Sequence, residues 1–142
     1  MPALPLAAAQ TIIETALAHA RKTSLKPLVV AVLDARGVLK AAAAEDGTSL
    51  RRYEIAHGKA HGALAFGLGS RALSKRAAEQ PYFIAAATHA ANGALIPVPG
   101  GVLIRTGDGE LLGAVGISGD TSENDEACAL AGIAAAGLHA EP

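Results

Sequence analysis

Two histidines, His57 and His61, stand four residues apart in a stretch with helical composition. That spacing places both imidazoles on one helical face, where they form either a solvated surface pair or a two-nitrogen site for a metal or a haem edge. The stretch is not a zinc-protease motif, because Gly58 stands where the general-base glutamate would have to be. The chain has five histidines: His19, His57, His61, His89 and His139.

Lys59 falls on the opposite side of the same helix, in line with Ala56, Ala60 and Ala63. A lysine among alanines either snorkels from a core face or is held inward to bind an anion. Its position therefore raises the question of what its charge meets inside the fold.

A corner of prolines and glycines at residues 97–101 precedes an apolar hairpin, and Asp120 and Thr121 open the last helix. The N–H groups of a helix start favour a carboxylate or phosphate, although ordinary capping explains these two residues equally well. We expect the corner to face Lys59 and to form an apolar pocket with one cation, suited to a small carboxylate or a haem propionate. The predicted ligand-binding residues are Lys59, Pro99, Gly100, Gly101 and Thr121. The candidates for catalysis are Lys59, His61 and Asp125, and the candidates for metal binding are His57 and His61.

Other catalytic motifs are absent from the sequence. The pair Gly100 and Gly101 is not a dinucleotide-binding fingerprint, and the spacing around Ser118 is wrong for a nucleophile elbow. Cys128 lies in an alanine-rich helical segment and is interpreted as a small packed hydrophobic residue.

Helices and short apolar strands must position these residues. We expect helices at 5–23, at 48–65 with Thr48 or Ser49 as cap, at 70–79 with Ser70 as cap and Pro81 as terminator, and at 120–137 with Asp120 or Thr121 as cap. Residues 82–91 fit either a helical turn or an apolar loop. Strands are expected at 28–33, 38–43, 94–97, 102–105 and 111–118, with tight turns at 34–37 and 106–109. The predicted class is α+β, with a single five-stranded antiparallel sheet flanked by the first, second and last helices.

The composition is that of a globular protein. The 142 residues fit one domain, 1–142, and 51% of them are hydrophobic. A net charge of −1 gives no basic field for nucleic acid, and no apolar run reaches the length of a membrane span. The first twenty residues lack a basic start and predict an amphipathic helix, not a signal peptide, so we expect a cytoplasmic protein. Smooth alanine-rich faces predict a homo-oligomer.

Several motifs together resemble the GlcG/HbpS family, whose domain also forms the C-terminal part of PduO. They are VAVLDARG at 30–37, IAHGKA at 55–60, AFG at 65–67, PGGVLI at 99–104 and GAVGISGDT at 113–121, followed by Asp125 and an alanine helix. The resemblance covers nearly the whole chain. It implies a profilin-like fold, oligomers, and the binding or degradation of haem. Exported haem-binding members carry a secretion signal, and we expect none in this chain.

Two functions from different classes follow. The first is a small-ligand-binding protein that holds haem or a related tetrapyrrole, which makes haem the implied cofactor. The alternative is a small catabolic enzyme in which Lys59 and the helix start at Thr121 bind an organic acid while His61 or Asp125 transfers protons. A structural or assembly factor without a small-molecule site is the third possibility.

Overall fold

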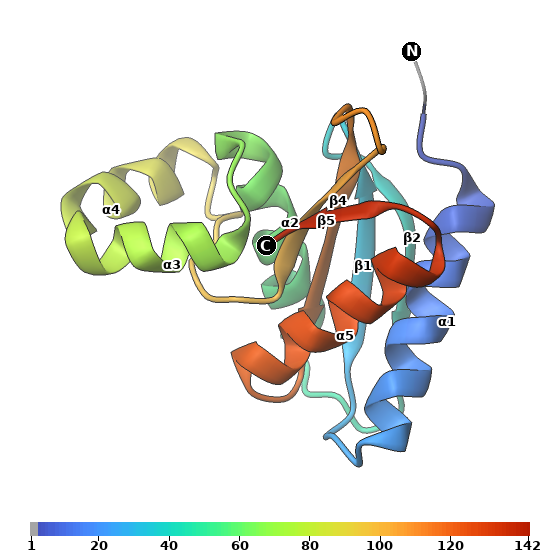
Figure 1. Ribbon diagram of the computed structural model, residues 1–142. Coiled ribbons are helices and arrows are strands. Elements are labelled where there is room, and N and C mark those ends of the chain that lie inside the picture. Colours follow the sequence, from blue (N-terminus) through green and yellow to red (C-terminus); the bar gives the residue numbers. More distant parts are fainter. Residues whose placement is uncertain (1–2) are drawn as a thin grey trace.

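The protein is built around one five-stranded antiparallel sheet, as the sequence predicts. The computed structural model describes residues 3–142. The strands are β1 Val29–Asp34, β2 Leu39–Ala44, β3 Gly101–Arg105, β4 Leu111–Ser118 and β5 His139–Glu141. Their order across the sheet is β2-β1-β4-β3-β5, so that β2 and β5 are the edge strands (Figure 1). The predicted α+β class is confirmed.

Within this described part of the chain, five helices surround the sheet: α1 Leu6–Lys22, α2 Arg52–Phe66, α3 Ser70–Glu79, α4 Pro81–Ala90 and α5 Ser122–Ala135. Helices α1 and α5 pack together on one face, and α2 covers β4, β3 and β1 on the other (Figure 1). Helices α3 and α4 form a hairpin that projects to the side of the sheet. No helix within residues 3–142 combines the length and apolar character that crossing a membrane requires.

Small residues let α2 lie directly on the sheet. A Cβ atom added at Gly116 of β4 would collide with the carbonyl oxygen of Ala56 in α2. The helix turns Ala56, Ala60 and Ala63 toward the strands, and all three are fully buried. The core on this face is therefore thin, whereas branched side chains such as Ile12 fill the core under α1 and α5.

One predicted strand is wrong. Residues 94–97 form an irregular segment along α2, where the Ile96 N–H donates to the carbonyl of Gly58. Prolines at positions 97 and 99 lack the N–H groups that a strand ladder needs, which explains why pairing does not develop. The fifth strand is instead β5, which follows α5 and pairs with β3.

Several predicted helix ends are also corrected. The cap of α2 is Arg51, not Thr48 or Ser49, and the cap of α3 is Gly69, not Ser70. Residues 82–91 are mostly helical, because Pro81 begins α4 as its first residue besides ending α3. The prediction of Thr121 as the cap of α5 is confirmed, since its side chain accepts a hydrogen bond from the Asn124 N–H.

Candidate functional site

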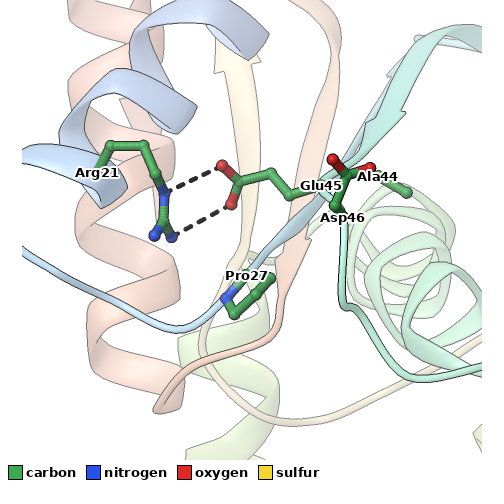
Figure 2. Close-up of a pocket in the computed structure, with 5 residues that line it drawn as sticks. All are labelled: Arg21, Pro27, Ala44, Glu45 and Asp46. Carbon is green, nitrogen blue, oxygen red and sulfur yellow. Dashed lines mark hydrogen bonds and ion pairs between the residues drawn. The ribbon is translucent and has the colours of Figure 1, made fainter.

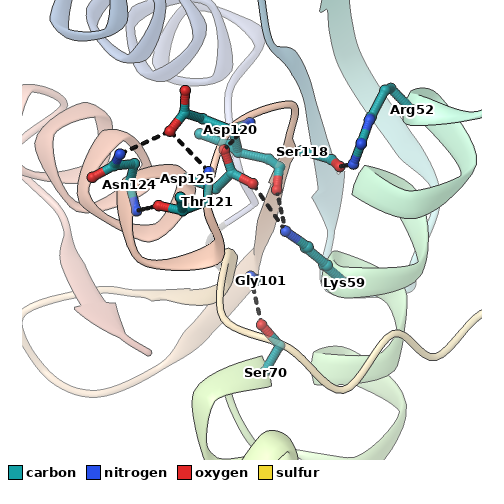
Figure 3. Close-up of polar contacts among 10 residues, drawn as sticks. Arg52, Lys59, Ser70, Gly101, Ser118, Asp120, Thr121, Asn124 and Asp125 are labelled. Atoms are coloured by element: carbon teal, nitrogen blue, oxygen red, sulfur yellow. Dashed lines mark hydrogen bonds and ion pairs between the residues drawn. The ribbon is translucent and has the colours of Figure 1, made fainter. Parts of the chain in front are cut away.

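Lys59 forms a buried ion pair with Asp125. Its Nζ atom lies 3.2 Å from Oδ2 of Asp125 and donates a hydrogen bond of 2.8 Å to the carbonyl oxygen of Ile117 (Figure 3). The two side chains are only 3% and 1% exposed. The second oxygen of Asp125 accepts from the backbone N–H of Asp120 at 3.0 Å. The pair therefore connects α2, β4 and the first turn of α5.

Burial is the largest influence on both charges of this pair. It lowers the pKa of Lys59 and raises the pKa of Asp125, while the attraction between the two groups acts against both shifts. Within residues 3–142, every buried side-chain nitrogen and oxygen has a hydrogen-bond partner. The Lys59 charge is thus balanced inside the protein without an external anion.

The glycine corner does face Lys59, as expected, but the protein itself fills the space beside it. A Cβ atom at Gly100 would lie 2.8 Å from Nζ of Lys59, and one at Gly101 would collide with the Lys59 carbonyl. The Gly101 N–H donates to Oγ of Ser70 at 2.6 Å. The glycines therefore allow a lysine to pass close to the backbone, and Ser70 accepts the hydrogen bond of the Gly101 N–H.

The start of α5 is a closed capping network. Thr121 accepts from the Asn124 N–H, and the Asp120 carboxylate accepts from the Asn124 side chain and from the Thr121 N–H (Figure 3). The same carboxylate also accepts from the Lys26 N–H. These hydrogen bonds lower the pKa of Asp120 to about 2. Capping thus explains the position of Thr121 at this helix start.

His57 and His61 lie side by side on α2, as their spacing predicts. Their rings are 20° from parallel with centroids 5.5 Å apart, and Tyr53 continues the row one turn earlier. Within residues 3–142, no group of three or more His, Cys, Asp and Glu side chains is placed to hold a metal. Partial burial and the neighbouring His61 ring lower the pKa of His57.

His61 differs from His57 because the backbone fixes its ring. Its Nδ1 atom lies 2.9 Å from the carbonyl oxygen of Ala94. The ring borders an open hollow of about 500 Å³ between α2, the end of α4 and the segment that follows it. The other lining residues are mostly small and apolar: Ala65, Phe66, Ala90, Ala91, Asn92 and Ala94.

Phe66, which lines this hollow, packs against an aromatic side chain of α4. The ring of Phe83 meets that of Phe66 edge-on at 6.1 Å, and the Arg76 guanidinium lies 4.2 Å from the Phe83 centroid. Through Phe83 and Phe66, Arg76 is thus connected by side-chain contacts to the lining of the hollow. Sequence reasoning could not find this arrangement, because Phe66, Phe83 and Arg76 come from three different helices.

Two further hollows have a charged lining. One of about 430 Å³ lies between α1 and the end of β2, where Arg21 pairs with Glu45 at 3.0 Å (Figure 2). The other, of about 650 Å³, contains Pro99 together with Arg71, Lys75 and Glu123. Arg71 is already engaged, because its guanidinium makes a bidentate pair with Glu126. Pro99 of the predicted corner therefore borders this hollow.

Comparison with known proteins agrees with this fold. The family model described as haem degrading protein HbpS-like matches residues 4–134. The chain is similar to the structure of the PduOC–heme complex, with 27% identity and a TM-score of 0.88 over 99% of this chain and 100% of that chain. It is similar to HbpS, with 28% identity and a TM-score of 0.80 over 94% and 90%. It also shares the fold of protein ORFY from Klebsiella pneumoniae, with 23% identity and a TM-score of 0.84 over 94% and 90%. No curated protein matches the sequence.

Proposed function

The chain belongs to the HbpS-like family of haem degrading proteins, and we propose that it binds haem or a related tetrapyrrole in the hollow beside His61. The observation that carries the proposal is the contact of 2.9 Å between Nδ1 of His61 and the Ala94 carbonyl. Because a carbonyl oxygen only accepts, Nδ1 carries the proton and Nε2 of the neutral ring keeps its lone pair. That tautomer is the one that binds a metal through Nε2, with the backbone orienting the ring.

The hollow suits a flat, largely apolar ligand. Its volume of about 500 Å³ lies within the usual range for small-molecule sites, roughly 300–1,000 Å³. Alanine methyl groups make a smooth wall against which a planar ring packs, and Phe66 adds an aromatic edge. Arg76, beyond the Phe66 and Phe83 pair, supplies a cation for a carboxylate group at the rim of such a ligand.

The residues at and near the proposed haem site then have separate roles. His61 would ligate the iron, the Ala94 carbonyl would hold the imidazole in one orientation, and the walls would exclude water from one face of the ring. A bound haem supplies the redox chemistry of its iron. Lys59 and Asp125 stabilise the junction of α2, β4 and α5 and take no direct part in ligation.

A catabolic enzyme acting on an organic acid is the alternative function. The hollow beside Pro99 favours it, because Arg71 and Lys75 give that hollow two cations. A small carboxylate would meet Lys75 there, whereas Arg71 is committed to Glu126. Lys59 is a weaker candidate for binding the carboxylate, because its amino group is buried and paired with Asp125.

A difference absorption titration of the purified protein with haem tests the proposal. Metal-free protoporphyrin serves as the matched ligand, because it has the same ring and carboxylates without iron. We expect haem to give a saturable spectral change and to bind more tightly than the metal-free ring. The absence of saturable haem binding, or equal affinity for both ligands, would contradict iron ligation by His61.

A further inference from the structure

Strand β2 leaves one edge of the sheet without a partner strand. Among residues 3–142 it pairs only with β1, and it occupies the end of the strand order (Figure 1). It is six residues long and reads LKAAAA, without proline and with Lys40 as its only charge. Proteins usually protect such an edge with several charges, a proline or a covering element, because its free N–H and C=O groups pair readily with another strand.

The hydrogen-bond alternation shows which groups are free. The Glu45 N–H donates to the carbonyl of Leu28 on the β1 side, and Ala44 is registered with Val29. In an antiparallel ladder, alternate residues bond to the same neighbour, so Ala43 and Ala41 also bond toward β1. The N–H and C=O groups of Ala42 and Ala44 therefore point to the open edge.

The side chains around this edge are small or apolar and exposed. Ala41 and Ala43 pack under the α1 side of the core, whereas Ala42 and Ala44 are exposed on the other face, where α2 covers β1 and not the edge. Val38 and Leu39, at the start of the strand, are 50% and 48% exposed. Methyl groups of this size allow a second strand to approach without steric conflict.

The charges at the two ends of β2 indicate which strand pairs with this edge. Lys40 lies at one end, and Glu45 followed by Asp46 lies at the other. Glu45 is paired with Arg21, but the carboxylate of Asp46 lies outside that pair (Figure 2). Neither Lys40 nor Asp46 has an ion-pair partner within residues 3–142. If the β2 strands of two copies pair antiparallel, the end with Lys40 in one strand lies beside the end with Asp46 in the other.

We infer that β2 pairs antiparallel with β2 of a second copy of this chain, across a two-fold axis near Ala43, to form a continuous ten-stranded sheet. The contact is isologous, so every outward donor of one strand meets an acceptor of its identical partner. This surface is on the β2 edge and is independent of any ligand at His61.

The molar masses of the ligand-free parent and of the Ala42→Pro variant, measured by light scattering, test this interface. Proline removes the outward N–H of residue 42 and leaves the bonds to β1 in place. We expect the parent to have at least twice the 14.1 kDa mass of one chain, and the variant to have half the parent mass or less with an unchanged circular dichroism spectrum. Tyr82→Ser is the matched control, because Tyr82 is a 91% exposed aromatic residue on α4, away from β2.

A charge exchange tests the same interface without proline. Lys40→Glu should raise the dissociation constant of the dimer by about tenfold, because like charges then meet at both ends. The double variant Lys40→Glu/Asp46→Lys should restore the parent value. A monomeric parent, a full-mass Ala42→Pro variant, dissociation by Tyr82→Ser alone, or a double variant as weak as Lys40→Glu would each overturn the inference.

Discussion

Replacing Lys59 by Met tests whether the buried ion pair holds the fold together. The substitution keeps the aliphatic stem and leaves the Asp125 carboxylate buried without its cation. At 3.2 Å and an effective dielectric constant of about 20, the attraction between the two charges is about 5 kcal/mol. Removing one partner of a buried pair costs about 3–5 kcal/mol, and we expect a loss in that range. Because a domain is stable by roughly 5–15 kcal/mol in total, the variant should fold but unfold much more easily.

The pH dependence of this loss provides the sharper test. Burial raises the pKa of Asp125, and without Lys59 no cation opposes that shift. A carboxyl whose pKa is raised on folding stabilises the fold when protonated, and this contribution is lost as pH rises through the folded pKa. The difference in unfolding free energy between parent and variant, measured by urea denaturation, should therefore be large at pH 7 and smaller at pH 5.

A double variant controls for the loss of packing. Asp125→Asn retains an oxygen for the Asp120 N–H, so Lys59→Met/Asp125→Asn removes both charges and keeps that hydrogen bond. We expect it to be more stable at pH 7 than Lys59→Met alone. If Lys59→Met instead stays within about 1 kcal/mol of the parent at every pH, the pair does not stabilise the fold. Weaker ligand binding by that stable variant would return Lys59 to the ligand site.

Three further predictions concern acid stability, thiol reactivity and packing. Hydrogen bonds lower the pKa of Asp120 from 3.8 to about 2, so stability should fall as pH drops through this interval, and Asp120→Asn should flatten that part of an acid-unfolding curve. Burial raises the pKa of the Cys128 thiol to about 11, so a thiol-specific reagent should label it at pH 7 only after unfolding. Gly116→Ala should destabilise the protein by about 1–3 kcal/mol or more, because the new methyl group meets the backbone of α2. Gly58→Ala should cost less, because its methyl group meets the side chain of Ile96 and not a backbone atom. Urea denaturation compares the two.

Much of the fold could be predicted from local sequence signals. The turn at 34–37 and the short apolar run before it indicated β1 and β2, and the turn at 106–109 between two apolar runs indicated β3 and β4. The fifth strand, His139–Glu141, could not be predicted, because three mixed residues form a strand only where β3 offers them an edge. The apolar run at 94–97 was wrongly predicted to be a strand, because its side chains are buried by packing on α2, where Leu95 faces Gly62.

The candidate site was predicted less well than the fold. Helical spacing correctly placed Lys59 on the inner face of α2, opposite His57 and His61. Its partner was not predicted, because Asp125 is 66 residues away and approaches from the other side of the sheet. A carboxylate in the first turn of a helix has a sufficient local explanation in the helix dipole, which concealed its longer-range contact. The bond from His61 to Ala94 likewise depends on tertiary packing alone.

The haem affinity of His61→Ala, measured beside that of His57→Ala, tests the central claim most directly. Both substitutions remove one imidazole from the same face of α2, but only His61 has its ring fixed by a backbone carbonyl at the hollow. We predict that His61→Ala weakens haem binding by about tenfold or more, at least ~1.4 kcal/mol, and that His57→Ala leaves the affinity near the parent value. Parent-like haem affinity and spectrum in His61→Ala would contradict the assignment of His61 as the iron ligand.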